Sequence, residues 1–139
     1  MNDQLLPGWE LQGVDERRMK MLALVLRDPN PIHYDAEAVR ALGLGERPVN
    51  QGPANLAYIL TMLRQAFPEH TLDRIHARFL GSVYAGDHVI AGGRVRTTSG
   101  TASGETVTCE VWLERRGHGR VVQGTATLRC PVLCAPDLR

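Results

Sequence analysis

Hydrophobic and polar residues follow two different periods along this chain, and the period changes near the middle. Up to about residue 67, apolar residues recur every three or four positions, which is the spacing of one face of an α-helix. After Thr71, apolar and polar residues alternate one by one, as they do along a half-buried β-strand. The pattern therefore predicts a helical first half and a strand-rich second half.

Two amphipathic helices are predicted before residue 45. The first covers residues 15–27, with Asp15 as its N-cap and Pro29 as its stop, and its apolar face comprises Met19, Leu22, Ala23 and Leu26. The second covers residues 35–42 and ends at two glycines, Gly43 and Gly45.

A third helix is predicted over residues 53–67, where Gly52 precedes a proline at a favoured first position and Pro68 closes the segment. Its apolar residues occupy most of the circumference: Ala54, Leu56, Ala57, Ile59, Leu60, Met62, Leu63 and Ala66. Because a helix that is apolar on nearly every side is buried on nearly every side, we expect this helix at the centre of the fold.

Turn residues divide the second half into four expected antiparallel strands: residues 74–83, 87–98, 104–115 and 119–129. Solvent-facing positions are expected at His76, Arg78, Thr106, Thr108 and Glu110. One sheet and one buried helix must pack together, so we predict an α+β fold in which a curved antiparallel sheet wraps around helix 53–67. A single domain is expected over residues 1–139, since 43% hydrophobic residues suffice for one core.

Composition narrows the classes of function. Sixteen Lys and Arg against fifteen Asp and Glu give a net charge of +1, which offers no general field for attracting nucleic acid or an anionic membrane. The longest apolar run, residues 21–26, is far shorter than the roughly 20 residues of a membrane-spanning helix. The acidic first twenty residues lack a signal-peptide core. We therefore expect a cytoplasmic protein that binds neither nucleic acid nor a membrane.

Cysteines and histidines give no metal signal. Cys109, Cys130 and Cys134 are an odd number without paired ligand spacing, and we expect free thiols, although Cys130 and Cys134 could approach each other. The five histidines show no i, i+4 pairing, and no glycine-rich nucleotide motif occurs. Neither a metal nor a cofactor is expected.

The stretch "LRDPNPIHYD" at residues 26–35 carries the first candidate chemistry. Its prolines leave the turn between Asp28 and His33 few conformations, which allows two interpretations. The turn can simply end a helix. Alternatively, it holds a carboxylate and an imidazole within reach of one water, and such an acid and base are what adding water across a double bond requires.

The second candidate is the Gly52-Pro53 step at the start of the third helix. Gly52 offers a backbone N–H without a helical acceptor, backed by the positive end of the helix dipole. A carbonyl oxygen placed there would be polarised, and an enolate formed from it would be stabilised. The same dipeptide is also a common way to begin a helix without any chemistry.

Together these residues resemble a known family. The elements Asp28-x-Asn30-Pro31-x-His33-x-Asp35 and Pro48-Val49-x-x-Gly52, followed by "ARFLGSVYAGDHV" at residues 77–89, are similar to the MaoC-like dehydratases. These include the (R)-specific enoyl-CoA hydratase group, which has the hotdog fold. The likeness runs from about Asp15 to about Leu128.

The resemblance implies an activity and a role for each site residue. The activity is hydration of a 2-enoyl thioester of coenzyme A or an acyl carrier to a 3-hydroxyacyl thioester, or the reverse dehydration. Asp28 and His33 would hold and activate the water, Gly52 would bind the thioester carbonyl, and Asn30 would brace the loop. The family commonly has His where this chain has Gln51, which we expect to orient the loop or the substrate without transferring protons. A further polar residue of the family's central helix is not evident in the turn Ile59-Leu60-Thr61.

Two other functions are considered. A thioesterase of the same fold often takes a carboxylate from the central helix, yet residues 53–67 contain no Asp or Glu. A non-catalytic partner subunit of a dehydratase usually loses the Asp or the His, and this chain retains both. Pairing of sheet edges predicts a homodimer. Arg64, Arg74 and Arg78 are candidates to meet coenzyme A phosphates, although each is also suited to a solvated surface.

Overall fold

The computed structural model describes residues 3–131. Its elements follow in the order β1 (Trp9–Leu11), α1 (Glu16–Val25), the 3-10 turn η1 (Pro31–His33), α2 (Ala36–Ala41), α3 (Gly52–Ala66), β2 (Thr71–Phe79), β3 (Val89–Thr101), β4 (Gly104–Arg115) and β5 (Gly119–Pro131). The predicted division into a helical and a strand-rich half is confirmed, apart from β1.

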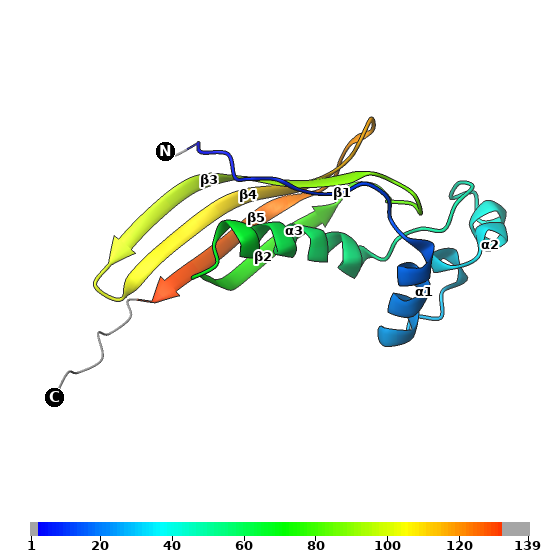
Figure 1. Cartoon of the computed structure of the whole chain (residues 1–139), viewed down its shortest axis with the longest axis horizontal. Helices are drawn as coiled ribbons and strands as arrows, with labels where there is room; N and C mark the ends of the chain where they lie inside the picture. Colours follow the sequence, from blue (N-terminus) through cyan, green and yellow to red (C-terminus); the bar gives the residue numbers. More distant parts are fainter. Residues whose placement is uncertain (1–2, 132–139) are drawn as a thin grey trace.

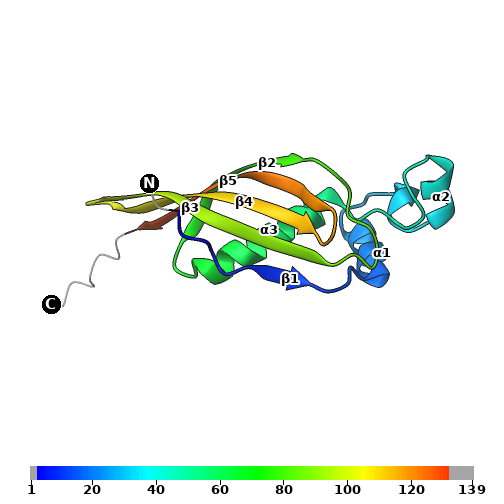
Figure 2. The same cartoon turned by 90° about the horizontal axis from the view of Figure 1, so that it is seen from above.

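All five strands form one antiparallel sheet in the order β1-β3-β4-β5-β2. Figures 1 and 2 show α3 lying along one face of this curved sheet. The predicted α+β arrangement is therefore confirmed. Strands β3, β4 and β5 follow one another as hairpins, but β2 crosses to the far edge and pairs with β5. The spacing of apolar residues along one strand carries no information on this crossover.

Strand β1 was not predicted. It has three residues and pairs with β3, with Trp9 opposite Ala91. A run of three residues is too short to show a period of two, so the segment acquires strand geometry only because β3 offers a free edge. The predicted strand 74–83 also shifts, since β2 begins at Thr71 and ends at Phe79.

The core lies between α3 and the sheet. Ile59, Met62 and Leu63 of α3 pack against the inward residues of β3, β4 and β5, among them Val89, Ala91, Val107, Cys109, Val111, Leu113, Val122, Ala126 and Leu128. The prediction that α3 is buried on nearly every side is wrong for this chain. Leu56 and Leu60 are only half-buried and Ala57 is exposed, because the sheet covers one side of the helix.

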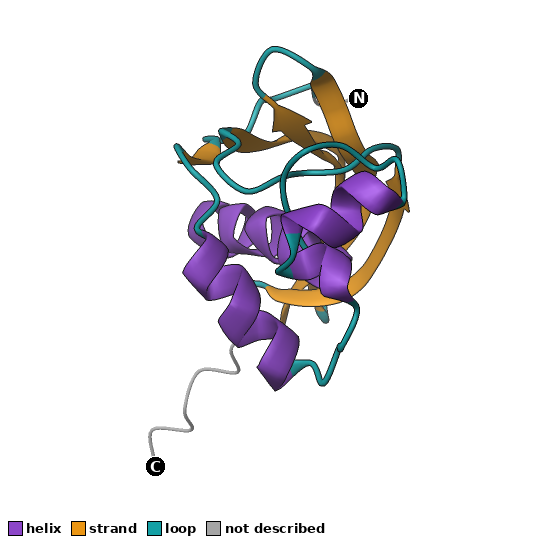
Figure 3. Cartoon of the chain, turned by 90° about the vertical axis from the view of Figure 1, so that its right-hand side faces the viewer, coloured by secondary structure: helices purple, strands orange, loops and turns teal. Residues whose placement is uncertain are grey.

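Helices α1 and α2 extend beyond the end of the sheet at which α3 begins (Figures 1 and 3). Asp15 caps α1 as predicted, accepting a hydrogen bond from the Arg17 backbone N–H at 2.7 Å. Asp35 caps α2 in the same way. No described helix combines the length and the apolar character needed to cross a membrane.

Candidate active site

The end of α1 fixes the backbone of Asp28. The helix ends at Val25, two residues before its predicted end, because Arg27 takes a left-handed conformation with φ 51°. The N–H of Arg27 then bonds to Leu24 O at 3.1 Å and that of Asp28 to Ala23 O at 2.9 Å. This closure normally uses glycine, so an arginine here stores about 1 kcal/mol of strain beside the candidate acid.

The proline turn brings Asp28 and His33 into contact. His33 Nε2 lies 3.1 Å from Asp28 Oδ2, with the imidazole buried and the carboxylate partly exposed. Asn30 shapes the turn as expected of a brace: its N–H donates to Asp28 Oδ1 at 3.1 Å, and its own Oδ1 accepts from the Ile32 N–H at 3.3 Å. The pair touches directly, so a water reaching both would lie beside the contact.

A second contact sets the tautomer of His33. Its Nδ1 lies 2.6 Å from the carbonyl oxygen of Val49, which can only accept, so Nδ1 carries a proton. A neutral Nε2 facing an ionised Asp28 would set lone pair against lone pair. A proton between Asp28 Oδ2 and His33 Nε2 would make this contact a hydrogen bond, and the two groups are placed to pass a proton between them.

Gly52 is the first residue of α3, so its N–H has no acceptor within the helix. Val49, which holds His33, precedes it by three residues, a span of at most about 10 Å. A Cβ added at Gly52 would meet Phe79 Cε1 at 3.5 Å, an ordinary van der Waals contact. Space within this chain therefore does not require glycine at this position, which leaves close approach of a ligand as a reason for it.

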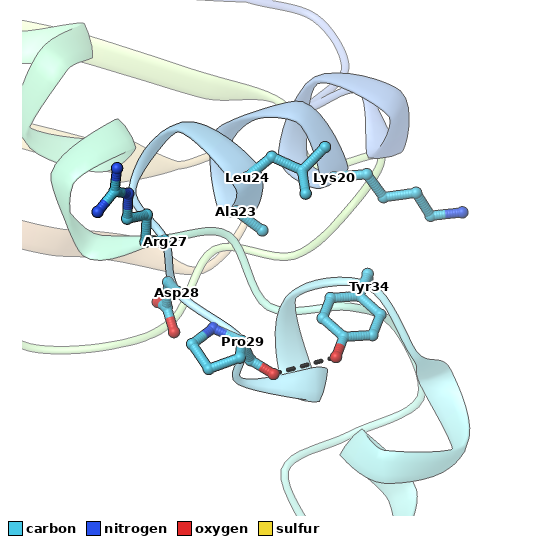
Figure 4. Close-up of a pocket in the computed structure, with 7 residues that line it drawn as sticks. All are labelled: Lys20, Ala23, Leu24, Arg27, Asp28, Pro29 and Tyr34. Atoms are coloured by element: carbon cyan, nitrogen blue, oxygen red, sulfur yellow. Dashed lines mark hydrogen bonds between the residues drawn. The ribbon is translucent and has the colours of Figure 1, made fainter.

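An open pocket of about 670 Å³ adjoins Asp28 (Figure 4). Apolar groups make up most of its wall, and its lining residues are Lys20, Ala23, Leu24, Arg27, Asp28, Pro29 and Tyr34. Tyr34 donates its hydroxyl hydrogen bond to Pro29 O at 3.0 Å, which steadies the turn.

The cations of this pocket are Lys20 and Arg27. The three arginines considered from the sequence do not line it: Arg64 borders a small pocket with Phe67, Arg78 borders one with His76, and Arg74 is exposed on β2. The sequence therefore suggested basic residues that the fold does not bring to Asp28 within one chain.

Gln51 is fully buried between α1 and the start of α3. Its Nε2 donates to the backbone oxygen of Met19 at 2.9 Å, while its Oε1 has no hydrogen-bond partner among the described residues. The side chain thus joins α1, the helix that precedes Asp28, to α3, the helix that begins at Gly52. This buried position agrees with an orienting role for Gln51 and not with a role in transferring protons.

A polar cluster on α3 was missed by the sequence analysis. Asn50 Nδ2 donates to Asn55 Oδ1 at 2.9 Å and to the Tyr58 hydroxyl at 3.2 Å. Burial raises the pKa of Tyr58, whose ring stacks on Trp9 with 5.4 Å between centroids. Asn55 and Tyr58 are polar residues three apart on α3, a spacing that is visible in the sequence.

This cluster borders a second pocket, of about 470 Å³, between β1, α1 and α3. Its lining shares no residue with that of the pocket beside Asp28. The two flanks of α1 therefore face different surroundings: one faces the acid–base pair, the other the amide and hydroxyl groups of α3.

Within residues 3–131, no cluster of three or more His, Cys, Asp or Glu side chains is arranged to hold a metal ion. Cys109 and Cys130 are free, and burial raises the pKa of the Cys109 thiol to about 11. Cys134, and with it any approach to Cys130, lies outside the described residues.

Proteins of known structure superpose on most of this chain. An (R)-hydratase from A. caviae involved in PHA biosynthesis superposes with a TM-score of 0.81 at 20% identity, over 94% of this chain and 97% of that one. An R-hydratase from Pseudomonas aeruginosa gives 0.78 at 21% identity, over 94% and 82%. A 3R-hydroxyacyl-ACP dehydratase complex from Mycobacterium tuberculosis gives 0.76 at 14% identity, over 92% and 96%.

At these identities the structures show the fold alone, and they confirm the predicted hotdog fold. No curated protein matches the chain. The family model described as "MaoC like domain" matches residues 10–113, which is most of the chain and includes Asp28, His33, Gln51 and Gly52. The chain therefore belongs to the family of MaoC-like domains.

Proposed function

We propose that this protein adds water to the double bond of a 2-enoyl thioester to give a 3-hydroxyacyl thioester, or catalyses the reverse dehydration. The observation that carries the proposal is the contact of 3.1 Å between Asp28 and His33, with the second imidazole nitrogen held by Val49 O. The names of the hydratase and dehydratase structures with this fold support the same reaction class.

The reaction needs one proton to leave water and one to reach the substrate. A water bound beside Asp28 and His33 loses a proton to the pair as its oxygen bonds to C3 of the enoyl group. The proton held by the pair goes to C2, where the electrons of the double bond have moved. The pair ends with the number of protons it had at the start, so no redox cofactor takes part in the balance.

Negative charge develops on the thioester oxygen while C3 is attacked. The Gly52 N–H, at the positive end of the fifteen-residue helix α3, is suited to donate a hydrogen bond to that oxygen. The apolar pocket beside Asp28 offers surface to the hydrocarbon part of a substrate. Asn30 shapes the turn, and Gln51 connects the two halves of the site.

Hydrolysis of the thioester is a weaker proposal. The polar side chains that α3 turns inward are the amide of Asn55 and the hydroxyl of Tyr58, and neither is a carboxylate that could activate water for attack on the carbonyl. The acid–base pair comes instead from the turn after α1.

A homodimer is proposed from two unpaired surfaces. Strand β2 forms an edge of the sheet, with β5 as its only neighbour among the described strands. Phe79 and Leu80 at its end are each about half exposed, and α3 also keeps an incompletely buried side. Pairing two β2 edges would continue the sheet and cover these groups. Light scattering at micromolar concentration should return twice the chain mass; a monomer mass would contradict this.

The test of function is a panel of enoyl thioesters of increasing chain length on coenzyme A and on an acyl carrier protein. Loss of the conjugated double bond should be observed with at least one member, together with appearance of the 3-hydroxyacyl product. Release of free thiol without that product would favour hydrolysis. Absence of both reactions across the panel would favour a non-catalytic partner subunit.

A further inference from the structure

The carbonyl that orients His33 belongs to a short segment, residues 47–50, which we call the strap. The strap carries Val49, whose O contacts His33 Nδ1 at 2.6 Å and whose N–H donates to Ile32 O at 2.8 Å. Its position therefore decides where the imidazole points. The strap belongs to no helix or strand, so its position depends on what holds it.

The strap is held by the turn that precedes β3. Asn50 N–H donates to Val83 O at 2.7 Å, and Ala85 N–H donates to Pro48 O at 2.9 Å. These bonds form a short antiparallel bridge in which Val49 is opposite Tyr84. The strap is thus a short extended segment outside the named strands. Its register is set by its pairing with residues 83–87.

A single buried carboxylate fixes that turn. Asp87 Oδ2 accepts from the Tyr84 N–H at 2.9 Å and lies 2.5 Å from Arg115 Nε, while Oδ1 lies 2.9 Å from Arg47 Nη2. Arg47 also donates to Ala85 O at 2.5 Å. The Tyr84 ring lies against both guanidinium groups, at 5.5 and 4.9 Å, and its hydroxyl donates to Leu44 O at 2.8 Å.

We propose that Asp87 is a positioning residue for the acid–base pair: by holding Arg47 and the Tyr84 turn, it fixes the strap whose Val49 carbonyl keeps His33 in the Nδ1–H tautomer facing Asp28. Asp87 does not touch the substrate in this proposal. Its effect reaches His33 through Arg47, the backbone bridge at Val49 and the imidazole bond. The inference rests on the proposed function for its effect on turnover, but not for its effect on the histidine ring.

The chain contains a matched control. Glu110 on β4 is also held by two arginines, Arg96 and Arg120, the latter at 3.0 Å. That cluster lies on strands β3, β4 and β5 and has no bond to the strap. Glu110→Gln removes a carboxylate from between two guanidinium groups without touching the contacts of Val49 or His33.

The experiment follows His33 by nitrogen NMR in 15N-labelled protein, with His33→Gln to assign its signals. In the parent, Nδ1 should carry a slowly exchanging proton. Asp87→Ala should lose that slow exchange, and the signals of the two ring nitrogens should average. Asp87→Asn should show both changes in part, because its amide oxygen can still accept from Tyr84. Glu110→Gln should match the parent. Circular dichroism and a melting curve show which variants are folded at the temperature used.

Turnover is measured on the same proteins. Asp87→Ala should lower kcat about tenfold or more with little change in KM, as expected when reacting groups are misplaced, and Glu110→Gln should leave kcat unchanged. A folded Asp87→Ala with parent-like ring signals overturns the inference, as does an equal change in Glu110→Gln. If the parent itself turns over no enoyl thioester, the proposed function fails, and the ring signals still decide the role of Asp87.

Discussion

Three histidines of this chain each contact a carboxylate, and they differ in what surrounds the contact. His33 lies 3.1 Å from Asp28, His70 lies 2.9 Å from Glu105, and His88 lies 2.7 Å from Glu10. By distance alone the Asp28 pair would rank last. The comparison teaches that a short contact between an acid and a base does not identify a catalytic pair.

The surroundings of the three contacts distinguish the Asp28 pair from the other two. His33 is anchored at its other nitrogen by a backbone carbonyl, and its partner sits on a closed turn beside a pocket and near the start of a helix. The partners of the other two are exposed surface carboxylates, with Glu105 at 47% and Glu10 at 56% of side-chain exposure. The second nitrogen of His88 faces Arg116 at 3.4 Å. Only the first pair has both a fixed tautomer and room for a substrate.

The largest expected effect is at the Asp28 pair. Asp28→Asn and His33→Ala should each lower kcat on the best enoyl thioester by at least about a hundredfold, the low end of acid–base effects. Because both act on one water, the double variant should be little worse than either single one. Steady-state kinetics on folded proteins measures this. Near-parent activity in both single variants would contradict the catalytic role, and multiplicative losses would show independent action.

The next effect concerns the Gly52 N–H, which lies three residues after Val49, the residue whose carbonyl contacts His33. Gly52→Pro removes the donor, whereas Gly52→Ala keeps it and places a Cβ in ordinary contact with Phe79. The proline variant should lose about 3 kcal/mol of transition-state stabilisation, about a hundredfold in rate, and considerably more than the alanine variant. The ratio of their kcat values isolates the donor; equal losses would indicate that the N–H plays no part.

A smaller effect is expected at Gln51, which joins α1 to α3. Gln51→Ala leaves Met19 O without its donor and should destabilise the fold by about 1–3 kcal/mol, while lowering activity through positioning. Gln51→His can restore the bond to Met19 and should keep activity within about tenfold, near 1.4 kcal/mol in barrier. Melting curves and pH–rate profiles measure both. Loss of an inflection in the alanine variant, or activity that appears only in the histidine variant, would contradict an orienting role.

The smallest effects are expected at the other two histidine pairs. His70→Gln and His88→Gln remove exposed contacts that contribute about 0–1 kcal/mol to stability, and neither residue adjoins the turn at Asp28. Activity should stay within about twofold of the parent and the melting temperature should shift by a few degrees at most. A hundredfold loss in either variant would remove the distinction between the Asp28 pair and the other two pairs.

The sequence determined the parts of this protein that depend on local chemistry. The cap at Asp15, the proline turn from Asp28 to His33 and the glycine that begins α3 could all be recognised because each acts through residues within one turn of itself. The change from a helical to a strand period predicted the α+β arrangement for the same reason, while the hotdog fold was implied by the resemblance to the MaoC-like family. Periodicity reports which face of an element is apolar, and that property is local.

The tertiary structure decided the features that depend on contacts between segments distant in the sequence. The crossover of β2, the strand β1, the exposed side of α3 and the tautomer of His33 all follow from partners far away in the chain, such as Val49 O for the imidazole. Gln51 shows most clearly what the sequence leaves undetermined. Its sequence neighbours suggest a role at the helix start, but its amide donates a hydrogen bond to Met19, thirty-two residues away. A side chain's partner is set by how elements pack, and one-dimensional spacing does not contain that information.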